Sequence, residues 1–370
     1  MKTRLCEQLG IELPIIQAPM AGGVTTPELV AAVSNAGALG SFGFAYTQPE
    51  AMQRDADAVR ELTCAPFCVN FFVADNTGAI DEGAQRSALD AIAPYYEACG
   101  LKRPQAVRPP FAPDQAAQLD AVEAIAPAVF TFHLGEISAG RIASMRSRGI
   151  RVGGSATCVA EAKHLQSLGV DFIVAQGAEA GGHRGTYLRD PSSAMTGTLA
   201  LVRLIVRAVS VPVIAAGGIM DGAGIAAALA LGAQAAQLGT AFVPCAESGA
   251  SALHKAAILA AQDDDTVVTE KFSGKPARAL ANRYTREMHE RNAPHLAFPA
   301  QNALTGPLRA AAARAGDSEF LALWAGQAAA LSRELPAARL VQTLCDETRA
   351  ALQALSHLNS SGSAASMKSA

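Results

Sequence analysis

The chain has 370 residues, of which 50% are hydrophobic and 17% are charged, and its formal net charge at pH 7 is −3. A plain eight-fold α/β barrel needs roughly 250 residues, so a large core and an additional segment both fit within this length. The slightly acidic balance excludes the basic surface that nucleic acids or anionic membranes attract.

Short β-rich runs alternate along the chain with longer helical runs, which is typical of a parallel α/β fold. Alanine-rich helical patterns occupy residues 27–36, 114–125 and 159–168, for example. The predicted strands are residues 14–18, 38–42, 67–71, 128–132, 151–155, 172–176, 211–216 and 234–238. Eight strands with helical crossovers favour a TIM (β/α)8 barrel over an open sheet, which would also carry a Gly-x-Gly-x-x-Gly turn that is absent here.

Two segments exceed the minimal barrel. Residues 79–103 add a helix after the third strand, and a longer segment after the eighth strand carries further helical runs. Residues 340–355 are amphipathic and predict the eighth barrel helix, which makes the longer segment an insertion. The predicted domains are a TIM-barrel, FMN-binding domain at residues 1–246 and 339–356, a smaller, mainly helical cap or substrate domain at 247–338, and a disordered tail at 357–370.

The seven cysteines are odd in number, scattered and without a CxxC pair, which predicts buried free thiols and no metal site. The first ten residues lack the apolar core of a signal peptide, and Gly, Pro and polar residues interrupt the most apolar stretches. We therefore expect a cytoplasmic monomer or homodimer with small-molecule partners and no nucleic-acid or membrane partner.

In TIM barrels the active site lies at the C-terminal ends of the strands. The predicted strand ends carry Gln17, Ala18, Pro19, Met20, Asn70, His133, Gln176, Gly217, Gly218, Gln237, Leu238, Gly239 and Thr240. A phosphate group commonly binds at the loops after strands seven and eight, and glycine on both loops lets the backbone approach it. The helix that starts near Asp221 would direct its positive end at this anion. Tight turns without a ligand are the alternative explanation of these glycines.

The polar residues at the strand ends favour FMN as the phosphate-bearing ligand. Asn70 and Gln176 both donate and accept hydrogen bonds, which suits the mixed polar edge of a flavin. Met20 is placed to pack beside a planar ring. No Lys or Arg stands at the strand ends, as would be common for a carboxylate or bisphosphate substrate. Capping of loops is the alternative role of Asn70 and Gln176.

The loop after strand six reads Ala178-Glu-Ala-Gly-Gly-His-Arg-Gly-Thr186 and contains the predicted catalytic residue, His183. Gly181 and Gly182 let the chain curl close to a ligand, and a histidine there can take or give a proton near neutral pH. A solvated histidine, or one paired with Glu179, is the alternative. His133 is a second candidate that either contacts the ligand or is a hydrogen-bonded core histidine.

Five runs and a segment of the cap together resemble the nitronate monooxygenase family, formerly called 2-nitropropane dioxygenase. These are residues 15–22 (IIQAPMAG), 30–40 (VAAVSNAGALG), 69–71 (VNF), 175–185 (AQGAEAGGHRG), 215–219 (AAGGI) and 298–309 in the cap. The Arg-Gly-Thr that follows His183 is typical of the class I enzymes of this family.

The resemblance implies non-covalent FMN and oxidation of alkyl nitronates, such as propionate 3-nitronate, with O2 to a carbonyl compound and nitrite, which is a detoxifying reaction. The implied flavin contacts are Asn70, Gln176, Gly181, Gly218 and Gln237 to Thr240, with Gln17 to Met20 beside the flavin. His183 would deprotonate a nitroalkane or orient the nitronate, and its positive form would favour the anion. Phe298 stands where a Tyr is expected, which bears on substrate preference.

Three alternatives remain from the sequence. Flavin-dependent enoyl-ACP reductases have a similar Glu-Ala-Gly-Gly-His run, but they need NAD(P)H and a wide acyl channel, and Arg184 argues against them. A flavin-dependent NAD(P)H:quinone reductase is a second and weaker alternative. A barrel isomerase or synthase that binds a phosphorylated substrate without flavin belongs to a different class, and a colourless preparation would favour it.

Overall fold

The structure is a computed structural model that describes residues 1–73 and 80–361. Its central sheet has eight parallel strands in the order β1-β9-β8-β6-β5-β4-β3-β2. They are β1 (Ile15–Gln17), β2 (Gly40–Gly43), β3 (Phe67–Phe72), β4 (Val129–His133), β5 (Arg151–Ala156), β6 (Phe172–Gln176), β8 (Val213–Ala216) and β9 (Ala235–Leu238). Leu39 closes the ring, because its N–H donates to Ile15 O at 3.0 Å and its carbonyl accepts from Gln17 N at 2.9 Å. The predicted TIM barrel is confirmed.

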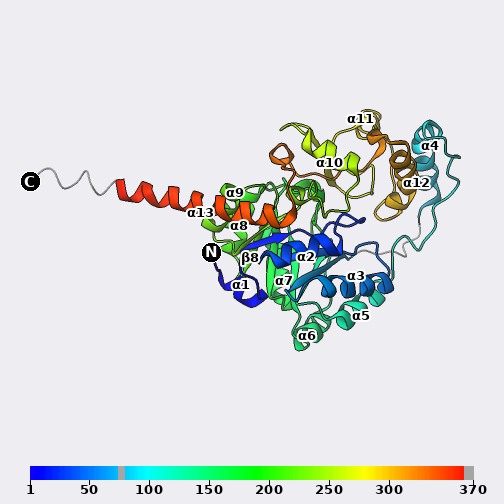
Figure 1. The fold of residues 1–370 in the computed structure, drawn as a ribbon. Coiled ribbons are helices and arrows are strands. Elements are labelled where there is room, and N and C mark those ends of the chain that lie inside the picture. Colours follow the sequence, from blue (N-terminus) through cyan, green and yellow to red (C-terminus); the bar gives the residue numbers. More distant parts are fainter. Residues whose placement is uncertain (74–79, 362–370) are drawn as a thin grey trace, which may run out of the picture.

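Helices surround this barrel, as Figure 1 shows. They are α1 (Arg4–Leu9), α2 (Pro27–Asn35), α3 (Pro49–Leu62), α5 (Gln115–Ile125), α6 (Ala139–Ser147), α7 (Val159–Leu168), α8 (Thr198–Val206), α9 (Gly222–Ala230) and α13 (Ala337–Ser361). The local sequence explains where several of these helices begin. Thr26 accepts a hydrogen bond from Leu29 N at the start of α2, where Pro27 is the first helical residue, and Asp114 caps α5 in the same way.

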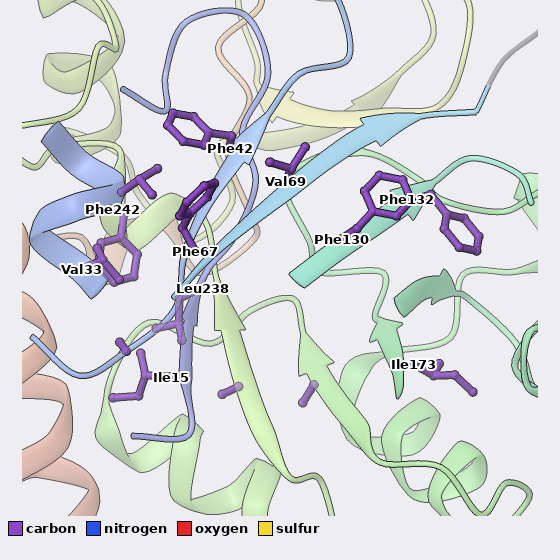
Figure 2. Close-up of a cluster of buried hydrophobic side chains, with 14 of the residues drawn as sticks. Ile15, Val33, Phe42, Phe67, Val69, Phe130, Phe132, Ile173, Leu238 and Phe242 are labelled. Carbon is purple, nitrogen blue, oxygen red and sulfur yellow. The ribbon is translucent and has the colours of Figure 1, made fainter. Parts of the chain in front are cut away.

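Side chains alternate between the two faces of each strand, and this alternation separates two cores. Ile15, Val69 and Phe130 belong to a large cluster between the strands and the surrounding helices, part of which Figure 2 shows. Ile16 and Val174 point to the opposite face of their strands, and they belong to a smaller cluster that also contains residues of α1. The smaller cluster therefore fills the barrel interior, and α1 closes its N-terminal end.

The segment after β9 packs over the opposite end of the barrel. It contains α10 (Ala252–Leu259), β10 (Thr266–Thr269), β11 (Ala277–Leu280), α11 (Arg283–Glu290) and α12 (Ala300–Ala315). The two strands form an antiparallel sheet with β7 (Gly182–His183), so this mainly helical cap also has a β-sheet that the sequence did not predict. The cap thus pairs directly with the loop that carries His183.

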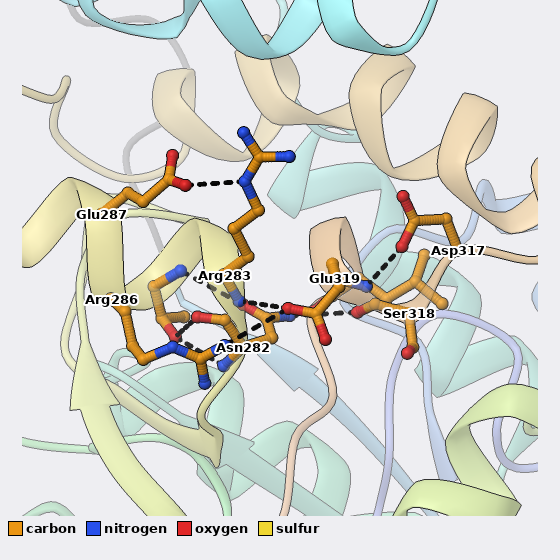
Figure 3. A network of polar contacts seen from close by, with 9 residues as sticks. Asn282, Arg283, Arg286, Glu287, Asp317, Ser318 and Glu319 are labelled. Carbon is orange, nitrogen blue, oxygen red and sulfur yellow. Dashed lines mark hydrogen bonds and ion pairs between the residues drawn. The ribbon is translucent and has the colours of Figure 1, made fainter.

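Polar contacts join the parts of the cap to one another. Asn282 caps α11 through Thr285 N, and its amide donates to the carbonyls of Ser318 and Leu321. Glu319 accepts from Arg283 N at 2.6 Å, so α11 is fixed to the segment after α12 (Figure 3).

The two extra segments of the sequence pack against each other. The predicted helix within residues 79–103 is α4 (Glu82–Ala98), and residue 79 lies outside the described residues. Buried residues of α4 share a core with α11 and α12 of the cap, beside which α4 lies in Figure 1. The interpretation of the longer segment as a separate cap domain, with the boundaries given above, stays a prediction.

The last helix, α13, packs on α9 and α2, the position expected of an eighth barrel helix. It continues to Ser361, so the predicted disordered tail is wrong for residues 357–361, and residues 362–370 lie outside the described residues. Within residues 1–73 and 80–361 no helix combines the length and apolar character that crossing a membrane requires.

Candidate active site

A cavity opens at the C-terminal ends of the barrel strands, under the cap. Most of the predicted site residues line it: Ala18, Pro19, Met20, Asn70, His133, Gln176, Gly181, His183, Gly217, Gly218, Gln237, Gly239 and Thr240. Gln17, Leu238 and Phe298 are not part of its lining. Within the described part of the chain, no three His, Cys, Asp or Glu side chains are grouped so that they could hold a metal ion.

Strand parity explains why Gln17 and Leu238 lie outside the cavity. Leu238 belongs to the cluster between strands and helices, and Gln17 has the parity of Ile15 in the same cluster. The amide of Gln17 is fully buried, accepts from Ser41 N at 2.9 Å and donates to Ser41 O at 3.2 Å. Both side chains therefore hold the barrel together beside the strand ends that face the cavity.

Asn70 lines the cavity, and no other described residue donates a hydrogen bond to its Oδ1. Its Nδ2 donates to Thr131 O at 3.1 Å and to Thr131 Oγ1 at 2.9 Å, which occupies both N–H bonds of the amide. The remaining group is the Oδ1 acceptor. Asn70 can thus accept a hydrogen bond from a ring N–H of a ligand, while it has little capacity to donate one.

The glycine loops after β8 and β9 expose backbone donors. Gly217 and Gly218 have φ values of 116° and 69°, a region that L side chains rarely adopt. No backbone carbonyl of residues 1–73 and 80–361 accepts from the N–H groups of Gly218, Gly239 or Thr240. These two loops therefore form the kind of backbone cradle that binds a phosphate group.

The expected contribution of the N-terminus of α9 to this cradle stays a prediction. The first N–H groups of α9 are already occupied, because Asp221 accepts from Gly224 N at 2.8 Å and Glu347 accepts from Gly222 N at 3.0 Å. Glu347 is itself paired with Arg333. Protein carboxylates therefore already accept from two of the first N–H groups of α9.

His183 lies where the barrel and the cap meet. It is paired with Ala277 in the β7–β11 bridge, and Arg184 N donates to Pro276 O at 2.7 Å. On the barrel side, the His183 carbonyl accepts from Gln176 Nε2 at 2.9 Å and from His133 Nε2 at 3.0 Å. Gln176 Oε1 accepts from Gly185 N at 2.8 Å, so this amide holds the loop as well as lining the cavity.

The imidazole of His183 is surrounded by aromatic rings. The ring centroids of Phe72, Phe298 and Trp324 lie 5.2, 5.4 and 5.4 Å from its own. The side chain is 8% exposed, and its Nε2 is buried without a hydrogen-bond partner among the described residues. An unpaired polar atom at a cavity wall is a contact point for a ligand, because leaving it unsatisfied costs stability.

Burial, and after it the charges of His133, Lys275 and Arg309, together lower the pKa of His183 to about 3. Burial likewise lowers the pKa of His133 to about 4. Both rings are therefore neutral at pH 7 in the protein alone. The positive form of His183 that would favour an anion is thus not the form present at pH 7 in the protein alone, and the positive charges near it are those of Lys275 and Arg309.

Several residues of the site escaped the sequence analysis. Tyr46 and Phe72 also line the cavity. Both follow predicted strands, 38–42 and 67–71, so the rule that barrel sites lie at strand ends would have found them. His254, Trp324 and Gly326 also line it, but they come from the cap, for which no positional rule exists. Gly326 N donates to Thr240 Oγ1 at 2.8 Å, which joins the cap to the glycine cradle.

Comparison with known proteins decides the family. The profile of the nitronate monooxygenase family matches residues 2–347. The chain belongs to the nitronate monooxygenase family. A nitronate monooxygenase of Paraburkholderia phytofirmans is 44% identical over 358 residues, which cover 96% of this chain and 97% of that protein. The family resemblance stated from the sequence is confirmed, and the protein is an oxidoreductase.

Solved structures agree with this assignment. A nitroalkane oxidase from Streptomyces ansochromogenes superposes with a TM-score of 0.86 at 40% identity, covering 95% of this chain and 99% of that one. FabK from Thermotoga maritima superposes with a TM-score of 0.77 at 30% identity, covering 97% and 99%. The fold of this chain is therefore common to these proteins over nearly their whole length.

Proposed function

We propose that the protein binds FMN without a covalent bond and oxidises alkyl nitronates, such as propionate 3-nitronate, with O2 to a carbonyl compound and nitrite. The observation that carries this proposal is the neutral, unpaired His183 Nε2 beside a cavity that also offers a backbone cradle for a phosphate group. The family supports the reaction type, and the residues below support the cofactor and the substrate class.

The residues of the cavity fit FMN. Gly218, Gly239 and Thr240 supply unpaired N–H groups for the phosphate, and Asn70 Oδ1 supplies an acceptor for a ring N–H. Ala18 and Met20 lie beside Gly239, where an added Cβ would sit 3.4 Å from Ala18 Cβ and 3.9 Å from Met20 Sδ, and all three residues line the cavity. FMN, when bound, supplies the electron acceptor that the side chains of this site lack.

The protein's own residues act on the substrate. A neutral His183 can accept a proton from a nitroalkane carbon or donate a hydrogen bond to a nitronate oxygen, according to its tautomer. An anion beside it would raise its pKa, which opposes the lowering by burial. Lys275 and Arg309 favour an anionic substrate electrostatically, and the rings of Phe72, Phe298 and Trp324 exclude water around His183.

The proposed reaction is tested by mixing purified, FMN-saturated protein with propionate 3-nitronate in air and measuring nitrite release together with O2 uptake. We expect both without added NADH or NADPH. Heat-denatured protein and free FMN at the same concentration are the controls. Turnover that appears only with a reduced nicotinamide would instead support the quinone reductase or enoyl-ACP reductase alternative.

A further inference from the structure

The carbonyl of His183 receives hydrogen bonds from two barrel strands. His133 Nε2 at the end of β4 donates at 3.0 Å, and Gln176 Nε2 at the end of β6 donates at 2.9 Å. A carbonyl oxygen only accepts, so Nε2 of His133 carries the proton and its Nδ1 is the unprotonated nitrogen of the neutral ring. This contact fixes the tautomer of His133 and occupies its Nε2.

The loop is shaped to receive the His133 ring. A Cβ at Gly185 would lie 2.5 Å from Cε1 and 3.0 Å from Nδ1 of His133, which is closer than real Cβ atoms approach. Gly185 does not have a positive φ, so space is what requires glycine here, since other residues could adopt this backbone conformation. The ring of His133 therefore lies against the backbone of the loop two residues beyond His183.

The cap holds the same loop from the other side. The β7–β11 bridge pairs His183 with Ala277, and Arg184 N donates to Pro276 O. With the backbone held on both sides, the His183 ring points into the space between Phe72, Phe298 and Trp324. Without His133, Gln176 would be the one remaining barrel residue among those described that donates to the His183 carbonyl.

We propose that His133 is a positioning residue, which orients the His183 ring by holding its backbone carbonyl and does not itself exchange protons with the substrate. This inference rests on the proposed role of His183 in nitronate oxidation. The sequence left two roles open for His133, contact with the ligand and a hydrogen-bonded core histidine, and this inference develops the second.

The test compares two substitutions of His133 in the full-length, FMN-saturated protein. His133→Gln keeps an amide donor of similar reach, whereas His133→Leu removes the donor. A displacement of about 1 Å at a reacting group costs on the order of a hundredfold in rate. We expect His133→Leu to lower kcat by about tenfold to a hundredfold with little change in FMN affinity, and His133→Gln to restore most of it.

A second readout does not depend on activity. Trp324 is the only tryptophan of the chain, and its ring centroid lies 5.4 Å from that of His183. Its fluorescence therefore reports on the position of the His183 ring. We expect a changed emission maximum or quantum yield in His133→Leu, and the wild-type emission in His133→Gln. Gly185→Ala, which displaces the His133 ring and leaves its chemistry intact, should resemble His133→Leu.

Two results would overturn the inference. Equal loss of kcat in His133→Gln and His133→Leu, with wild-type Trp324 emission in both, would show that His133 itself exchanges a proton. Wild-type kcat and emission in His133→Leu would show that it positions nothing. If the wild-type protein releases no nitrite from nitronates, the proposed function fails, and the Trp324 emission of the same variants still decides whether His133 holds the loop.

Discussion

Replacing His183 with Phe tests whether its Nε2 is free of partners in the protein. This atom is buried and unpaired among the described residues, and an unsatisfied buried polar group costs about 1–3 kcal/mol. A phenyl ring keeps the contacts with Phe72, Phe298 and Trp324 and brings no polar atom that would need a partner. We expect His183→Phe to stabilise the fold by about 1–3 kcal/mol and to abolish turnover, a trade of stability for activity.

Calorimetry measures this change at one pH and one FMN concentration. One kcal/mol corresponds to roughly 2 °C in Tm for a large domain, so the Tm of His183→Phe should rise by roughly 2–6 °C. His254→Phe is the matched control. His254 is also 8% exposed and lines the same cavity, but its Nε2 donates to Trp324 O at 3.0 Å.

The control should therefore lower the Tm, because it leaves the Trp324 carbonyl without its donor. A fall in the Tm of His183→Phe of the same size as that of His254→Phe would refute the reasoning. It would mean that His183 Nε2 is satisfied within the protein and is not held open for a substrate.

Three further predictions concern pH, proton transfer and FMN. Because the pKa of His183 is about 3 in the fold and near 6.5 in the unfolded chain, the unfolded chain binds more protons between these values. Urea midpoints of the wild type should thus fall as the pH drops from about 6.5, and the midpoints of His183→Phe should fall less. The variant His183→Asn should keep its FMN. It should lose more activity on a neutral nitroalkane than on the preformed nitronate. If it kept the same fraction of activity on both substrates, His183 would not be the base. Asn70→Leu should weaken FMN binding by about tenfold, the equivalent of one hydrogen bond of about 1.4 kcal/mol, and unchanged affinity in fluorescence titration would exclude Asn70 Oδ1 as a contact.

The barrel was predictable because its signals are local. Each strand is a short apolar run between helix-patterned segments, and residues such as Thr26 and Asp114 mark the helix starts. The strand-end rule placed Asn70 and Gln176 at the cavity correctly. It failed for Gln17 and Leu238 because alternation along the strand points both side chains away from the barrel interior, and a parity count from Ile15 would have shown this.

The cap contributed what the sequence analysis could not place. Lys275, Arg309 and Trp324 reach His183 only through the packing of the cap on the barrel, and no spacing in the sequence relates them to the glycine loop. The neutral state of His183 follows from the same packing, because burial is the largest cause of its lowered pKa. The pairing of β7 with β11 is likewise a contact between segments almost a hundred residues apart.

The central claim is that a nitronate bound in this cavity reduces FMN bound beside it. The most direct test is anaerobic mixing of the FMN-saturated protein with propionate 3-nitronate and, separately, with NADH, while the flavin absorbance is followed. The account predicts that the nitronate bleaches the flavin and that NADH leaves it unchanged over the same time. Bleaching by NADH alone would contradict it.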